Sequence, residues 1–188
     1  MELMPLIKEN QQILLQVAKQ SIEHGFGKNK PITLNLDDYP VELRKQMATF
    51  VTLEVNGNLR GCIGTLVAIR SLVKDVAYHA YVAAFSDPRF SKIRLDEFPM
   101  LDIHISLLSE PELMSFDSEE DLVQQLRPKI DGLILTDGIH KGTFLPSVWE
   151  SLNQPSEFVR YLKQKAGLSP DYWSNKITVE RYTAEYIS

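Results

Sequence analysis

The sequence contains a single cysteine, Cys62, and no long apolar run, and each of these scarcities excludes a class of protein. One cysteine cannot form a disulfide within the chain, and a chain without disulfides fits a reducing compartment. No apolar stretch approaches the roughly 20 residues that cross a bilayer, so we expect no membrane segment. The stretch Met1–Pro5 lacks the basic start and apolar core of a secretory signal. These features predict a cytoplasmic protein.

Positive charge is also in short supply. The chain has 20 Lys and Arg residues against 25 Asp and Glu, which gives a formal net charge of −5. Proteins that bind nucleic acid through its phosphates carry basic surfaces, so this balance predicts no general nucleic-acid binding. The length of 188 residues and the apolar content of 44% fit a globular protein with its own core. We expect one domain over residues 5–188, with a smaller second lobe.

The pattern of apolar residues predicts hairpins and helices rather than strands and helices in strict alternation. Two hairpins are expected, with strands over residues 50–55 and 59–66 and over residues 132–136 and 141–145. Further strands are expected over residues 101–108 and 177–187, and helices over residues 6–22, 72–84, 117–126 and 158–166. Strands that come in hairpins favour an α+β fold, with a largely antiparallel sheet and flanking helices.

The segment Leu59-Arg60-Gly61-Cys62-Ile63-Gly64 is the most informative stretch of the chain. Alternate side chains of a strand share a face, so Arg60 and Cys62 are expected to point the same way. A guanidinium near a thiol favours the thiolate, which is the reactive form. Gly61 and Gly64, which lack side chains, let another group approach the backbone closely. The segment therefore predicts a site in which Cys62 and Arg60 carry the chemistry and the glycines border a bound molecule.

Each of these residues also has a purely structural interpretation. An unpaired cysteine is often a buried small hydrophobe, so Cys62 has that alternative. Arg60 can bind an anionic group through its planar fork, or form an ion pair across the hairpin with Glu54. Asp87 and Arg89 follow the expected helix over residues 72–84 and can form a wall of the same site, or a turn that ends the helix. These alternatives stay open at the level of sequence.

The register of the first hairpin decides which side chains meet. A two-residue loop is the common geometry, but it would mix polar and apolar groups on both faces. A three-residue loop that includes Asn58 puts Thr52 opposite Cys62 and Glu54 opposite Arg60, with apolar residues on the other face. Register normally follows such a clean division of faces. We therefore predict that Thr52 pairs with Cys62.

Metal and nucleotide motifs are missing. The four histidines, His24, His79, His104 and His140, have neither the spacing of a helical pair nor that of a zinc loop. A second cysteine is not available to help them, so we predict no metal site. The glycines lack the spacing of a dinucleotide fingerprint, and the sequence identifies no cofactor. A Cys-His pair would require the fold to bring one of these histidines to Cys62.

The segment Leu59–Gly64 is similar to the signature of the AMMECR domain family, whose bacterial and archaeal members are called AmmeMemoRadiSam system protein A. Further family-like stretches are Ala83–Phe90, Asp131–Leu135, Thr143–Glu150 and Lys165–Leu168, so the resemblance covers nearly the whole chain. One departure is Lys129, where related bacterial sequences often have glycine. The resemblance implies a two-lobed α+β domain that acts with a MEMO-like protein and a radical SAM protein. It implies no established reaction.

Three classes of function agree with these observations. The first is an enzyme, or a component of one, that uses Cys62 and Arg60 on a small anionic or activated substrate. The second is a non-catalytic adaptor between the associated proteins, which predicts a large exposed apolar patch. The third is a ligand sensor, which predicts a closed pocket without a proton-transfer group. We favour a ligand or catalytic site, because an adaptor has no physical need for a cysteine between glycines.

Overall fold

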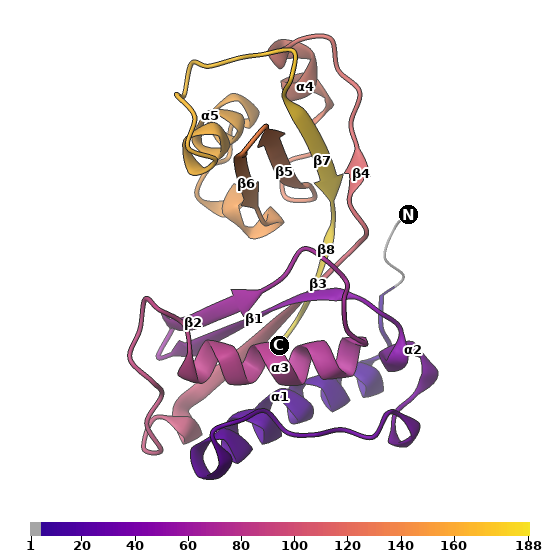
Figure 1. Ribbon diagram of the computed structural model, residues 1–188, viewed down its shortest axis with the longest axis vertical. Coiled ribbons are helices and arrows are strands. Elements are labelled where there is room, and N and C mark those ends of the chain that lie inside the picture. Colours follow the sequence, from indigo (N-terminus) through magenta and orange to yellow (C-terminus); the bar gives the residue numbers. More distant parts are fainter. Residues whose placement is uncertain (1–4) are drawn as a thin grey trace. The chain divides into compact units, whose positions relative to one another are not determined.

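The structure is a computed structural model that describes residues 5–188, and these form two compact units (Figure 1). The larger unit holds the described residues up to 108 together with 185–188, and the smaller unit holds residues 109–184. Both units combine helices with an antiparallel four-stranded sheet, which confirms the predicted α+β class. The secretory-signal expectation rests on residues 1–4, which lie outside the described part. Among the described residues, no helix has the length and apolar character needed to cross a bilayer.

The larger unit packs two long helices against one face of its sheet (Figure 1). The strands lie in the order β2-β1-β3-β8. In chain order the elements are α1 (Lys8–Lys28), η1 (Leu36–Asp38), α2 (Val41–Arg44), β1 (Ala48–Val55), β2 (Asn58–Gly64), α3 (Leu72–Phe85), η2 (Phe98–Met100), β3 (Leu101–Leu108) and β8 (Ala184–Ile187). Because β2 stands at one end of this order, the predicted signature lies on an edge strand.

The smaller unit has a second sheet in the order β4-β7-β5-β6. Its elements are β4 (Glu112–Leu113), α4 (Glu119–Gln125), β5 (Gly132–Asp137), β6 (His140–Phe144), η3 (Pro146–Glu150), α5 (Pro155–Lys165) and β7 (Thr178–Tyr182). The strand expected over residues 177–187 is therefore two strands, β7 and β8, in different sheets. Both predicted hairpins are present, as β1-β2 and β5-β6.

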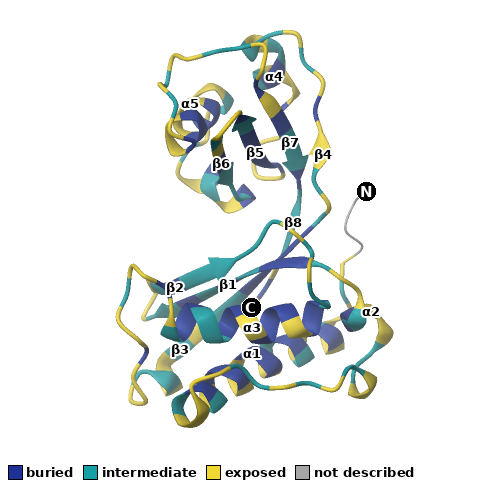
Figure 2. Ribbon diagram, viewed as in Figure 1, coloured by how far each residue is buried: buried dark blue, intermediate teal, exposed yellow. Residues whose placement is uncertain are grey.

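Burial in the larger unit follows the apolar stripe of the helix that was expected over residues 72–84 and is observed as α3 (Figure 2). The stripe residues of α3 are all buried, as are the strand residues that face them. They are Leu72, Val73, Val76, Ala77, Ala80, Ala83 and Ala84 from α3, and Val51, Leu53, Ile105 and Leu107 from the strands. The helix side of the sheet is thus an apolar core. Polar residues at alternate strand positions are left for the opposite face.

Lys129, which stands where similar sequences often have glycine, has a backbone conformation that glycine favours. Lys129 has a φ of +68°, in the left-handed region that favours glycine. It lies in the short connection between α4 and β5, where Arg127 bonds to the buried Asp131 through its backbone and side chain. The loop thus keeps a conformation suited to glycine although a lysine stands there.

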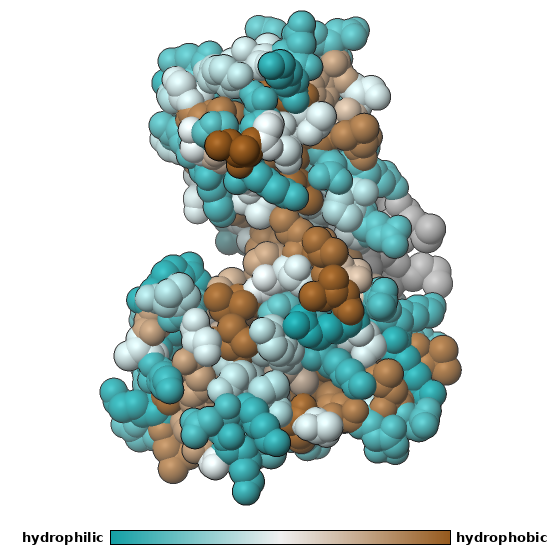
Figure 3. Space-filling view, viewed as in Figure 1, coloured by the Kyte–Doolittle hydropathy of each residue, from teal (hydrophilic) through white to brown (hydrophobic). Residues whose placement is uncertain are grey.

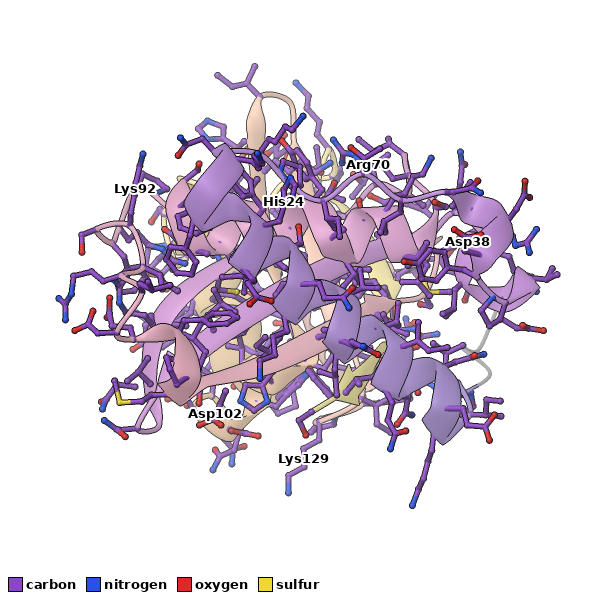
Figure 4. All side chains as sticks on the ribbon, turned by 90° about the horizontal axis from the view of Figure 1, so that it is seen from below. His24, Asp38, Arg70, Lys92, Asp102 and Lys129 are labelled. Carbon is purple, nitrogen blue, oxygen red and sulfur yellow. The ribbon has the colours of Figure 1, made fainter. Side chains whose placement is uncertain are left out.

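A buried polar cluster joins α3 to the start of β1. The Asp75 carboxylate is fully buried and accepts a hydrogen bond from Thr49 Oγ1 at 2.7 Å. The Nδ1 atom of His79 lies 3.1 Å from the same carboxylate, and Arg70 reaches its other oxygen at 3.4 Å. Arg70 lies just before α3 (Figure 4) and stacks over the ring of Tyr78. Because a buried carboxylate needs such partners, the cluster fixes how α3 sits on the sheet.

Replacing Thr49 by valine removes one donor to Asp75 with little change of shape. We expect the free energy of unfolding to fall by about 1–3 kcal/mol, the range for a buried polar group that loses a partner. Urea denaturation at pH 7 measures the change. The matched control is Thr178→Val on the exposed side of β7, which we expect to stay within about 0.5 kcal/mol of wild type. Equal stability of the two variants would contradict a structural role for this bond.

Candidate functional site

The first hairpin has the predicted register. Thr52 pairs with Cys62, Val51 with Ile63, and Leu53 with the glycine before the cysteine. The apolar partners face the helices, and Thr52 and Cys62 share the opposite face. Thr52 Oγ1 donates a hydrogen bond to Cys62 Sγ at 3.2 Å, and the cysteine is half-buried. The division of faces therefore predicts the register correctly.

The loop that produces this register differs from the prediction. Asn56 and Gly57 have φ values of +52° and +72°, so the hairpin closes with a two-residue turn rather than a three-residue loop. Glu54 pairs with Leu59, and the adjacent Leu53 pairs with Gly61. Arg60 lies between these two pairs, so the register shifts by one residue there. The expected Glu54–Arg60 pairing is therefore wrong. A bulge at Arg60 absorbs the extra residue and restores the register that burial requires.

Arg60 anchors the loop that follows α3. Its guanidinium bonds to the Glu97 carboxylate at 2.8 and 3.1 Å and to the carbonyl oxygens of Ser91 and Lys92. These contacts leave its side chain only 15% exposed. The ion-pair interpretation is right in kind, but the partner is Glu97 and not Glu54. The hydrogen bond from Arg60 is also the main reason that the pKa of Glu97 lies below its usual value.

The two predicted glycines are needed for packing within the unit. A side chain at Gly61 would overlap the backbone carbonyl of Ala83 on α3. One at Gly64 would overlap the ring of Phe50 and the carbonyl of Thr49. The helix and the neighbouring strand therefore approach β2 where it has no side chains. This explains both glycines without a bound molecule.

Asp87 and Arg89 bind the backbone of Cys62 at the free edge of β2. The Cys62 N–H donates to Asp87 Oδ2 at 2.9 Å, and Arg89 Nη2 donates to the Cys62 carbonyl at 3.0 Å. An edge strand otherwise presents such groups unpaired. The carboxylate and the guanidinium therefore take the place of a neighbouring strand. The structure brings together three of the predicted site residues.

Asp87 and Arg89 form an ion pair that keeps both side chains charged. Arg89 donates to both carboxylate oxygens, at 3.0 and 2.7 Å, while the Asp87 side chain is only 1% exposed. The Arg89 hydrogen bond is the largest cause that holds the pKa of Asp87 well below its usual range; burial opposes this, and the Cys62 N–H adds to it. The pKa of Arg89 is raised, first by Asp87 and in smaller part by the Cys62 side chain. Arg89 therefore is a cation beside Cys62.

The opposite sheet face carries one further candidate, His104. Thr52 pairs with His104 on β3 as well as with Cys62 on β2, so the three residues form a row across the sheet. The Nε2 atom of His104 lies 3.7 Å from the Glu54 carboxylate, and the two side chains are 40% and 33% exposed. Sequence reasoning could not select His104, because its place depends on a strand pairing distant in sequence. His24 lies on α1, one of the two helices that pack on the other face of the sheet (Figure 4).

The other histidines lie on elements other than the three strands β1, β2 and β3. His79 belongs to the buried cluster on α3, and His140 lies on β6 of the smaller unit. A groove of about 380 Å³ runs beside the start of β3 and is bordered by α1, residues 101–104 and Ser188. Of the site residues only His104 borders it, so the groove is not the Cys62 site. Within the described residues no group of three or more metal-binding side chains is placed to hold an ion.

Fold and site together define a class of α+β proteins with a cysteine signature clamped at a sheet edge. The AMMECR1 family model matches residues 15–187, and the chain belongs to this family. A protein from Methanothermobacter thermautotrophicus is 34% identical, over 98% of this chain and 97% of its own length. One from Pyrococcus abyssi is 36% identical, over 93% and 87% respectively. The crystal structure of an uncharacterized Pyrococcus horikoshii protein matches with a TM-score of 0.88 and 34% identity, covering 96% of this chain and 92% of that one.

Asp87 should make the stability of the protein depend on pH. Its pKa is depressed in the folded state, so its contribution is full above the unfolded pKa of about 3.9 and is lost as the pH falls below that value. We expect Asp87→Asn to lower the free energy of unfolding by about 1.5–3 kcal/mol at pH 7. The difference from wild type should shrink between pH 4 and pH 2.

Urea denaturation at a series of pH values measures this difference. Asp37→Asn is the control, because the Asp37 side chain is 86% exposed in a surface ion pair. We expect this control to have little effect at any pH. The Asp87–Arg89 pair that binds the Cys62 backbone is called the clamp. A difference between Asp87→Asn and wild type that does not change with pH would contradict a charged Asp87 in this clamp.

Proposed function

We propose that Cys62 and Arg89 form a site for a small anionic or thiol-reactive molecule. The observation that carries the proposal is the position of Arg89. It is bonded to Asp87 and to the Cys62 carbonyl, while 54% of its side chain stays exposed. A cation is thereby fixed next to the one thiol of the chain and stays open to solvent.

The surroundings of the sulfur support a role in nucleophilic chemistry. Thr52 donates to Cys62 Sγ, and Arg89 brings a positive charge to the same residue. Both groups complement negative charge on the sulfur or on a molecule that approaches it. Arg60, for which the sequence left a site role and an ion pair open, acts in this proposal by holding the loop that carries Arg89.

The partners follow from the family resemblance. We propose that the site acts together with a MEMO-like protein and a radical SAM protein, and that the ligand is small and anionic. A second candidate function, that of an adaptor, is favoured by Val67 and Ile69. These side chains are 61% and 58% exposed in the connection between β2 and α3. Elsewhere apolar and polar side chains are interspersed on the visible surface of each unit (Figure 3).

Alkylation of Cys62 tests the site, because no other cysteine can react. The folded protein is treated with neutral iodoacetamide and with anionic iodoacetate, and the ratio of the two rates is compared with that in urea. We expect folding to raise the relative rate of iodoacetate. Arg89→Met should lower it by about fivefold, since one unit charge at 4 Å contributes roughly 1 kcal/mol in water. Arg89→Lys should retain most of the effect.

Lys92→Met is the matched control, because it removes one positive charge from the same loop. Lys92 is exposed and lies at the periphery of the unit (Figure 4). This variant should leave the ratio unchanged. A Cys62 that reacts only after unfolding would overturn the proposal and leave the signature as close packing around a cysteine. An equal ratio in wild type and Arg89→Met would remove the role of the guanidinium.

A further inference from the structure

Cys62, Thr52 and His104 lie in one row on the sheet face that the helices do not cover. Neighbouring strands are about 4.8 Å apart, so the backbones of Cys62 and His104 are separated by roughly 10 Å. Thr52 lies between Cys62 and His104 in this row, and its hydroxyl donates a hydrogen bond to Cys62 Sγ. The hydrogen-bond partner of the thiol is accordingly Thr52 and not the imidazole, in contrast to a contact Cys-His pair.

The same spacing suits a water molecule held between the imidazole and a group attached to the sulfur. A reacting water needs to lie about 3–3.5 Å from the carbon it attacks, and a general base lies about 2.6–3.2 Å from that water. Together with one bond to sulfur, these two distances make about 8 Å, which suits two side chains that project side by side from backbones roughly 10 Å apart. The Glu54 carboxylate lies on the same face of the sheet, 3.7 Å from His104 Nε2.

We infer that Cys62 takes part in acyl transfer and that His104 is the general base for the second step. This inference rests on the proposed function, since it requires a reactive Cys62. In the first step the deprotonated sulfur adds to the carbonyl carbon of an activated ester or thioester. The carbon–leaving-group bond breaks, the leaving group departs with the electron pair, and the thiol proton has gone to solvent. Arg89 is the cation available to the carbonyl oxygen as it gains charge.

In the second step water attacks the carbonyl carbon of the thioester on Cys62. His104 takes the proton from that water, and the carbon–sulfur bond breaks. The sulfur leaves as the anion, the acyl group leaves as a carboxylic acid, and the imidazolium returns its proton to solvent. Another nucleophile with a removable proton, such as an alcohol or an amine, can occupy the position of the water. The substrate class is thus an activated acyl group.

The test uses p-nitrophenyl acetate, which reports each step separately. The wild-type protein should release a burst of p-nitrophenolate equal to the protein concentration, followed by slower turnover, and Cys62→Ser should abolish both. His104→Gln should keep the burst and reduce turnover about 100-fold, the scale of general base catalysis. Intact mass should then show acetyl-Cys62 accumulating. Added imidazole should restore turnover to His104→Ala, which a merely structural role would not produce.

His140→Gln is the control, because it removes a half-exposed histidine from the smaller unit. It should leave burst and turnover unchanged. The two proposals fail in different ways. If wild type gives no burst and Cys62 resists alkylation, the reactive-thiol site itself is overturned. If the burst is present but His104→Gln turns over like wild type, the role of His104 is overturned and the Cys62–Arg89 site stands.

Discussion

The contact between Gly61 on β2 and Ala83 on α3 is the constraint on which the rest of the larger unit depends. The helix carbonyl occupies the place where a side chain would stand, so α3 lies directly against the edge strand. Two residues after α3 ends at Phe85, the chain delivers Asp87 to the Cys62 N–H. A bulkier residue at Gly61 would push the helix outward and carry the clamp away from Cys62. Gly61 thus determines the position of α3, and α3 in turn determines where Asp87 meets the Cys62 backbone.

Stability and chemistry share the same residues at this edge. The Asp87 carboxylate and the Arg89 guanidinium satisfy backbone groups of Cys62 that an edge strand would otherwise expose. Because one side of Arg89 is fixed by these bonds, its exposed side keeps a defined position next to the sulfur. A freely moving arginine would lose side-chain entropy on binding an anion, and this one has already lost much of it on folding.

The sequence predicts local and face-dependent features well. The buried stripe of α3 and the pairing of Thr52 with Cys62 both follow from apolar periodicity, which burial enforces. The loop was predicted wrongly because turn geometry and register are separable, and a bulge at Arg60 reconciles them. The Glu97 partner of Arg60 and the position of His104 depend on contacts between distant segments. Nothing in local spacing encodes such contacts, so only the fold could supply them.

The short signature is constrained from both faces of one strand and from its edge. Gly61 and Ile63 face the helices, Cys62 faces the polar side, and the Cys62 backbone bonds outward to the Asp87–Arg89 clamp. A cysteine with a purely structural role would need only an apolar environment such as the one on the helix side of the sheet. The polar face instead places a hydroxyl, an imidazole and a carboxylate on the same side as the thiol. This excess of polar groups over what packing requires is the physical argument that the edge of β2 is a site.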